Sequence, residues 1–156
     1  MPAHGAELLW TAREDEDFLA GRYSRRHEIR FDGGAALAGS SSPAVVREPW
    51  SDPAAADPEE MFVASIASCH MLWFLDYARR AGVFVRAYRD MPFGEMGKNA
   101  EGRTAVLAVT LRPHADCDAD SATLEALHHK AHEACFIANS VTSDVRVEPV
   151  FEIAKV

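Results

Sequence analysis

The feature that most constrains this chain is a long apolar helix, which the sequence predicts from residue 57 to about residue 80. Asp57 can cap this helix, and Pro58 occupies the first helical position, where a missing N–H costs nothing. Gly82 follows a pair of arginines and is typical of a left-handed helix stop. Apolar side chains cover most of the helix circumference: Phe62, Ile66, Cys69, Leu72, Trp73 and Leu75. This pattern predicts a central, buried helix.

The composition is that of an ordinary globular protein. The 156 residues are 48% hydrophobic and 26% charged, and they predict an arm over residues 1–20 followed by one domain over residues 21–156. The net charge of −8 disfavours nonspecific binding to nucleic acid or to an anionic membrane, because both need a basic surface. The most apolar stretch, Met61 to Leu75, is interrupted by polar residues and is too short for a membrane span.

The cysteine content favours a reducing compartment. There are three cysteines, an odd number, and the N-terminal segment MPAHGAELLW does not read as a signal peptide. We therefore expect a cytoplasmic protein, in which a disulfide would be transient and catalytic rather than structural.

Strands are predicted on both sides of the long helix. Residues 23–31 alternate in polarity, and Asp32-Gly33-Gly34 predicts a hairpin with a return strand over residues 35–38. Further along the chain, we expect strands over 83–89 and 103–112, with a loop over 91–102 between them. A second helix is expected over 121–134. A closing strand is expected over 145–153, and Pro149 favours a place for it at the edge of a sheet. This order predicts an α+β fold with mainly antiparallel pairing.

The cysteines are the first candidates for chemistry. Cys69 lies in the predicted central helix, and Cys135 lies at or just beyond the end of the second helix. Each alone is more often a small core residue than a reactive thiol. Cys117 stands among aspartates, which raise the pKa of a thiol, so we expect an unreactive surface group.

Arg25 is the second candidate. By strand parity it shares a face with Tyr23 and Ile29, and a buried guanidinium needs a partner. It either snorkels outwards or points into a pocket, where a carboxylate would hold it and it would stabilise a thiolate. His27 has the same parity and the same two interpretations.

The second helix carries a weaker candidate for metal binding. His128, His132 and Cys135 lie along one stripe, a spacing that could bind zinc. A fourth ligand would have to come from elsewhere, and histidines on such helices are more often boundary residues. We expect no metal and no cofactor.

Two segments together resemble the OsmC/Ohr family of thiol peroxidases. The first is Asp57–Phe62 (DPEEMF), with a cysteine ten residues beyond Glu59. The second is His128–Ala131 (HHKA), leading to Cys135 and then to Ile137–Ser140 (IANS). The hairpin that contains Arg25 fits the N-terminal hairpin of the family, so the resemblance spans roughly residues 23–151.

The resemblance implies a fold, an activity and a set of site residues. The fold would be OsmC-like, with antiparallel sheets packed around a long central helix in an intertwined homodimer whose active sites lie at the subunit interface. Cys69 would be the peroxidatic cysteine and Cys135 the resolving one. Glu59 would position an arginine, which strand parity assigns to Arg25, with Arg22 as the alternative.

The implied activity is reduction of organic hydroperoxides, with a dithiol reductant that in some family members is a lipoylated protein. The alternative is a binding or redox-sensing relative that kept the fold without efficient turnover. Two departures from the family pattern place the chain in a side branch. His70 follows Cys69 where Ohr-type enzymes have an apolar residue, and Phe136 stands where many members have proline.

Helix geometry adds one expectation. Ten residues of helix advance ~15 Å, so Glu59 cannot reach Cys69 of its own chain along a straight helix. Either the first turn bends or Glu59 serves the site of a partner subunit. We predict the partner.

Overall fold

Helix α1, Pro58–Arg80, begins and ends where the local signals predict. The Asp57 carboxylate accepts a hydrogen bond from the Glu60 N–H at 2.7 Å, and the Glu60 carboxylate accepts one from the Asp57 N–H at 3.1 Å. This reciprocal capping box satisfies N–H groups that the first helical turn leaves free. Gly82 follows with φ of 74°, a left-handed conformation that favours glycine.

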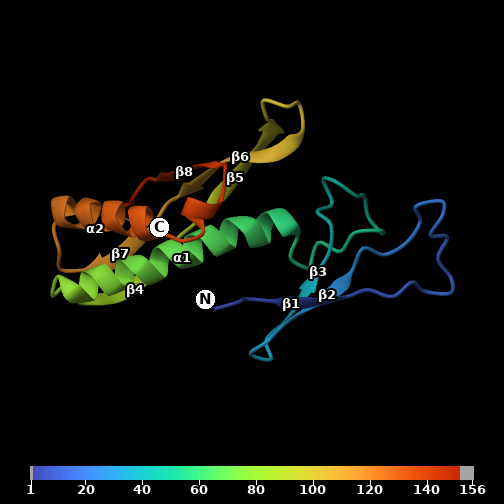
Figure 1. The fold of residues 1–156 in the computed structure, drawn as a ribbon, viewed down its shortest axis with the longest axis horizontal. Coiled ribbons are helices and arrows are strands. Elements are labelled where there is room, and N and C mark those ends of the chain that lie inside the picture. The colour runs from blue at the N-terminus through green and yellow to red at the C-terminus, as the bar shows by residue number, and fades with distance from the viewer. Residues whose placement is uncertain (1, 152–156) are drawn as a thin grey trace, which may run out of the picture. The chain divides into compact units, whose positions relative to one another are not determined.

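The computed structural model describes residues 2–151, and the chain divides into two units with the boundary between Met61 and Phe62. We describe each unit by itself. Figure 1 shows the strands of the N-terminal unit in blue and the elements of the C-terminal unit from green to red.

A three-stranded antiparallel sheet forms the N-terminal unit. Its order is β1-β2-β3, from β1 Ala6–Leu9, β2 His27–Phe31 and β3 Ala36–Gly39. The predicted hairpin between β2 and β3 is confirmed, and Gly34 has φ of 88° in its turn. The predicted arm, residues 1–20, contains a strand that we did not predict: β1 pairs with β2 over its whole length. Backbone pairing creates this strand, and side-chain periodicity does not reveal it.

The C-terminal unit combines two helices with two sheets. The strands are β4 Val85–Arg89, β5 Phe93–Lys98, β6 Thr104–Leu111, β7 His114–Cys117 and β8 Asp144–Val147. β4 pairs with β7 in an antiparallel ribbon, and the other sheet has the order β5-β6-β8 with β6 and β8 parallel. Helix α2, Ser121–Ala134, lies alongside α1 (Figure 1), and a single 3₁₀ turn, η1 Ala138–Ser140, follows it.

One predicted loop is a strand. Residues 91–102 contain glycines that suggested a turn, but β5 pairs with β6 over Phe93–Lys98. A Cβ at Gly94 would lie 2.9 Å from Cγ2 of Val63, so the missing side chain allows β5 to approach α1 closely. The closing strand β8 is shorter than predicted and ends before Pro149, as the missing N–H of proline requires.

Helix α1 contributes to both hydrophobic cores of the C-terminal unit. The larger core joins Phe74 and Ala78 to Ala115 and to residues of α2, and the smaller joins Ile66 and Ala67 to Val109 and Leu111. The prediction of a helix buried on all sides is only partly met, because Leu72 is 60% exposed. The faces of α1 that are buried are those that pack against other elements of the same chain.

The length of α1 corrects the expectation that the apolar stretch is too short for a membrane span. With 23 residues and a mean hydropathy of 1.3 over its most apolar window, α1 is long and apolar enough to cross a membrane. Core helices of soluble proteins pass the same test, so the support for a span is weak. Ile66 and Phe74 pack in the two cores, and 28% of the most apolar window of α1 is buried within the single chain.

Candidate active site

Two thiols from different helices meet inside the C-terminal unit. Cys69 lies in the middle of α1, and Cys135 caps the C-terminus of α2, where its N–H donates to the His132 carbonyl at 3.3 Å. The two thiols are neighbours, because Cys69 contributes to the raised pKa of Cys135, and Cys135 Sγ lies 3.9 Å from the carbonyl of Ile66, three residues before Cys69 on α1. Both cysteines are free. The sequence predicted that these residues act together, and the fold brings them together.

The two thiols have different surroundings. Cys135 is fully buried, and its Sγ accepts a hydrogen bond from the Ala138 N–H at 3.4 Å and donates to the Ile66 carbonyl at 3.9 Å. Burial, with a smaller contribution from Cys69, raises the pKa of the Cys135 thiol to about 11. Cys135 is therefore a protonated thiol at neutral pH. Cys69 is only half-buried, so a small molecule can reach it more readily.

An aromatic contact lies next to the thiols. Trp73 is one helical turn beyond Cys69, on the same face of α1, and Phe136 directly follows Cys135. The two rings meet edge to face, with centroids 5.4 Å apart and planes at 88°. Tyr77, one turn further along α1, stacks on Trp73 at 5.7 Å. Sequence reasoning noted Phe136 as a departure from the family pattern but did not predict this contact.

His70 does not supply a positive charge beside the thiol. Its ring is fully buried, and its Nε2 lies 3.0 Å from Nδ1 of His128. Burial, reinforced by the neighbouring His128 and His132, lowers the pKa of His70 to about 3, and burial lowers that of His128 to about 4. Both rings are neutral at pH 7, so neither can stabilise a thiolate as an imidazolium.

The zinc alternative does not fit the structure. His128 contacts His70, and the Cys135 sulfur contacts Cys69 and the Ile66 carbonyl. Within residues 2–151, no group of three or more His, Cys, Asp or Glu side chains is arranged to hold a metal ion. Cys117 is also not the surface thiol that we expected, since it is half-buried against the larger core.

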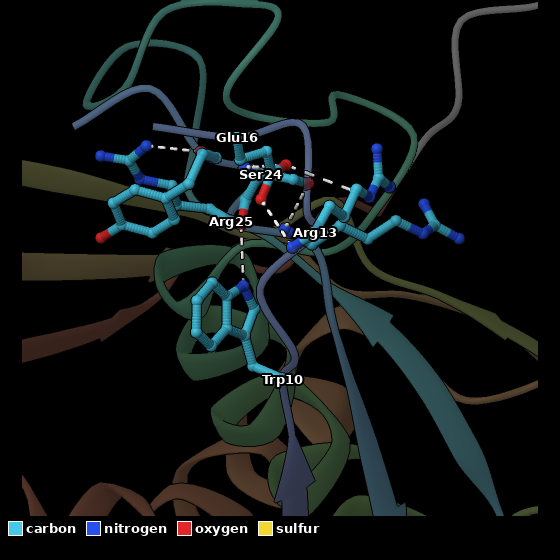
Figure 2. A network of polar contacts seen from close by, with 7 residues as sticks. Trp10, Arg13, Glu16, Ser24 and Arg25 are labelled. Carbon is cyan, nitrogen blue, oxygen red and sulfur yellow. Dashed lines mark hydrogen bonds and ion pairs between the residues drawn. The ribbon is translucent and has the colours of Figure 1, made fainter. Parts of the chain in front are cut away.

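Arg25 belongs to the N-terminal unit and is held there by carbonyl groups and an aromatic ring. Its Nη1 donates to the carbonyls of Gly21 at 2.9 Å and Tyr23 at 2.6 Å, and its guanidinium lies 3.6 Å from the centroid of the Tyr23 ring. Figure 2 shows Arg25 beside the network in which Trp10 Nε1 donates to the Ser24 carbonyl. His27 contacts the Arg25 carbonyl through Nδ1 at 2.9 Å.

The alternative arginine is paired with a carboxylate. Arg22 is exposed and forms an ion pair with Asp17 at 2.6 Å, whereas Arg25 forms no ion pair with any described residue. Its Nε and Nη2 atoms donate no hydrogen bond within the same part of the chain, so they are free to bind an anion. Because Arg25 and the cysteines belong to different units, their meeting stays a prediction.

Glu59 lies in the first turn of α1 and is half-buried. The helix is continuous from Pro58 to Arg80, so ten residues of helix, ~15 Å along its axis, separate Glu59 from Cys69. A role for Glu59 of the partner subunit stays a prediction.

Comparison with known proteins decides the family. Residues 51–150 match the family model described as OsmC-like protein. The chain belongs to the OsmC-like family. The match includes both cysteines and all of α1 and α2, so the family assignment rests on the segments that suggested it.

Solved structures agree with this assignment. An OsmC-like protein of unknown function from Vibrio cholerae is 44% identical, with a TM-score of 0.92, and the alignment covers 96% of this chain and 100% of that one. An organic hydroperoxide resistance protein from Legionella pneumophila is 19% identical with a TM-score of 0.68, over 98% of both chains. OhrB of Bacillus subtilis is 20% identical with a TM-score of 0.65, over 94% of this chain and 98% of that one. No curated protein matches the chain.

These likenesses confirm the predicted α+β, OsmC-like fold. The two hydroperoxide resistance proteins show a shared fold, and the more similar V. cholerae protein has no stated function.

Proposed function

We propose that this chain is a thiol-dependent peroxidase that reduces organic hydroperoxides. The observation that carries the proposal is the contact between two free thiols, one accessible and the other buried and protonated. A peroxidatic cysteine must be reached by its substrate, and a resolving cysteine must wait beside it. The structure therefore supports Cys69 in the first role and Cys135 in the second.

The reaction would proceed in three balanced steps. The Cys69 thiolate attacks the distal oxygen of the hydroperoxide, the O–O bond breaks, and the alkoxide leaves as the alcohol after gaining a proton. Cys69 is then a sulfenic acid. The Cys135 sulfur attacks it, forming the disulfide, while its proton and the sulfenic hydroxyl leave as water. An external dithiol reduces the disulfide and is itself oxidised.

Arg25 would stabilise the Cys69 thiolate, and Glu59 of the partner subunit would hold the guanidinium. Support comes from the free Nε and Nη2 donors of Arg25 within the described residues. A charge-assisted hydrogen bond to a thiolate is stronger than one between neutral groups, and it would raise the fraction of Cys69 that can react at neutral pH.

We propose that the active form is the intertwined homodimer. A single chain leaves many large apolar side chains exposed, more than a monomeric surface needs. They include Leu72 on α1, Phe84 in the C-terminal unit, and Leu8, Phe18 and Leu19 in the N-terminal unit. The dithiol reductant would be a lipoylated protein or a similar donor in a reducing compartment such as the cytoplasm.

Thiol counting tests the peroxidase proposal. The reduced protein is treated with one equivalent of cumene hydroperoxide, and free thiols are then counted. We expect loss of the Cys69 and Cys135 thiols, and Cys69→Ser should abolish it. A Cys117→Ser control should behave like the wild type, because Cys117 packs against the larger core and has no part in the proposed pair.

The second candidate is a redox-sensing protein without efficient turnover. It is favoured by one observation: no cationic side chain of the C-terminal unit, over residues 62–151, donates a hydrogen bond to Cys69. This candidate predicts that the thiols stay reduced under one equivalent of hydroperoxide and form a disulfide only in an oxidised glutathione buffer.

A further inference from the structure

The two thiols have an aromatic pair beside them that joins the same two segments. On α1, Cys69 and Trp73 are four residues apart and face the same way. After α2, Cys135 and Phe136 are adjacent. The thiol contact and the ring contact therefore lie next to each other, each with one partner on α1 and one at the end of α2.

The Phe136 ring is exposed, but it contacts α1 through Trp73. Its side chain is 67% exposed although the neighbouring Cys135 is fully buried, and its one aromatic partner within the described residues is Trp73. An edge-to-face aromatic pair contributes beyond the area that it buries, because the edge of one ring is attracted to the face of the other. The contact can hold the backbone of Phe136, and with it Cys135, against α1.

Hydrogen bonds extend this hold along the following turn. The Phe136 carbonyl accepts from Ser140 Oγ at 2.6 Å, and the Asn139 side chain donates to the Glu133 carbonyl at 2.9 Å. These bonds tie the segment after α2 to itself and to the end of α2. The Phe136 ring is the part of this turn that makes an aromatic contact with α1.

From this geometry we propose that Phe136, through its contact with Trp73, is a positioning residue for disulfide formation between Cys69 and Cys135. The inference deepens the proposed function by assigning a residue to its resolving step. Disulfide formation needs the sulfurs at ~2.05 Å with a restricted torsion, so a small loss of alignment lowers the probability of a productive approach. The ring contact would keep Cys135 in place while Cys69 is a sulfenic acid.

This role has a consequence for over-oxidation. A sulfenic acid that is not resolved can react with a second hydroperoxide, which oxidises it to a sulfinic acid and is itself reduced to the alcohol. Weaker positioning by Phe136 would slow the first path and leave the second unchanged. The balance between disulfide and sulfinic acid therefore reports on the aromatic contact.

A glutathione titration tests the positioning role without any peroxide. The wild type, Phe136→Ala and Phe136→Tyr are equilibrated in buffers of reduced and oxidised glutathione, and the disulfide fraction is measured. We expect Phe136→Ala to lower the equilibrium constant for the disulfide by about three- to tenfold, the usual worth of an aromatic pair, and Phe136→Tyr to retain it. His129→Ala, which removes an exposed ring from α2 that has no part in the thiol pair, should match the wild type.

Single-turnover kinetics test the resolving step itself. Sulfenic acid formation is measured with cumene hydroperoxide in a Cys135→Ser background, and disulfide and sulfinic acid are measured by intact mass with Cys135 present. Phe136→Ala should slow disulfide formation and increase the sulfinic fraction, while sulfenic acid forms at the wild-type rate. Trp73→Leu should reproduce this pattern, and Trp73→Phe should largely restore it.

Three results would overturn the inference. These are an unchanged glutathione equilibrium in Phe136→Ala, a loss in Phe136→Tyr as large as in Phe136→Ala, or an equal slowing of sulfenic acid formation, which would assign the ring to substrate approach. The two arms also separate the two proposals. A wild type that forms the disulfide with glutathione but does not react with hydroperoxide would reject the peroxidase, while the glutathione comparison would still decide the role of Phe136.

Discussion

His70 and His128 share a buried hydrogen bond between α1 and α2. Nε2 of His70 lies 3.0 Å from Nδ1 of His128, and both rings are buried, with that of His128 stacked on Phe74 at 4.1 Å. One ring donates and the other accepts, so the bond requires the accepting nitrogen to be unprotonated. A proton added to the accepting nitrogen removes the bond and leaves a charge in the interior.

This pair predicts a loss of stability in mild acid. The native pKa values, about 3 for His70 and about 4 for His128, lie below those of the unfolded chain, so the unfolded state binds more protons. The contribution to stability is complete above the unfolded value of about 6.5 and falls as the pH drops towards the native values, by up to about 1.4 kcal/mol per pH unit for each histidine. Urea unfolding at a series of pH values measures this slope.

Two variants assign the slope to the buried pair. His128→Leu should flatten the dependence on pH between about 6 and 5, because one titrating group is gone. His129→Gln changes an exposed histidine on the same helix and should leave the slope as it is. A slope that survives His128→Leu intact would contradict the prediction.

The different surroundings of the two thiols predict different rates of alkylation. Cys69 is half-buried and should react with iodoacetamide first, whereas Cys135 is fully buried and its pKa is raised to about 11. Reaction at Cys135 should therefore stay slow at pH 7 and rise steadily with pH up to about that value. Peptide mass spectrometry of samples quenched over time gives both rates, and faster labelling of Cys135 than of Cys69 at pH 7 would exchange their proposed roles.

The close approach of β5 to α1 predicts that Gly94 tolerates no side chain. A Cβ there would lie 2.9 Å from Cγ2 of Val63 and 3.3 Å from Cγ1 of Val106, and both neighbours are stiff, β-branched residues. Gly94→Ala should lower the free energy of unfolding by about 1–3 kcal/mol, the usual cost of overpacking. Gly33→Ala is the matched control, since no atom lies within 4 Å of its Cβ position. Equal stability of the two variants would show that β5 moves away freely.

The larger core predicts the cost of truncating α1. Phe74 is fully buried and contacts both the His128 ring and the Tyr88 ring. Phe74→Ala should destabilise the protein by about 3–5 kcal/mol, because it removes buried apolar surface and leaves a cavity. Leu72→Ala should cost the single chain much less, since Leu72 is exposed. A large effect of Leu72→Ala that depends on protein concentration would instead indicate a second subunit over this face.

Several features could be read from the residues because the signals for them are local. The capping box of Asp57 and Glu60, the stop at Gly82 and the turn at Gly34 each depend on a few neighbouring residues. These signals correctly predict α1 and the β2–β3 hairpin. The resemblance carried by the two cysteine segments predicted the family, which the comparison with known proteins confirmed.

Long-range features could not be read in this way. β1 and β5 were missed, because their pairing depends on distant strands and because the glycines of β5 resemble those of a loop until Val63 and Leu107 are seen against them. The contacts of His70 with His128 and of Trp73 with Phe136 join residues on different elements.

The residues alone determined that this chain contains a long apolar helix, a hairpin and a pair of cysteines of a known family, because caps, turns and periodicity act over a few residues. Only the tertiary structure decided that Cys69 is accessible, that Cys135 is buried and protonated, and that an aromatic contact lies beside them. Burial and the distance between two side chains depend on how α1 and α2 pack together, and that packing is a property of the whole C-terminal unit rather than of any segment within it.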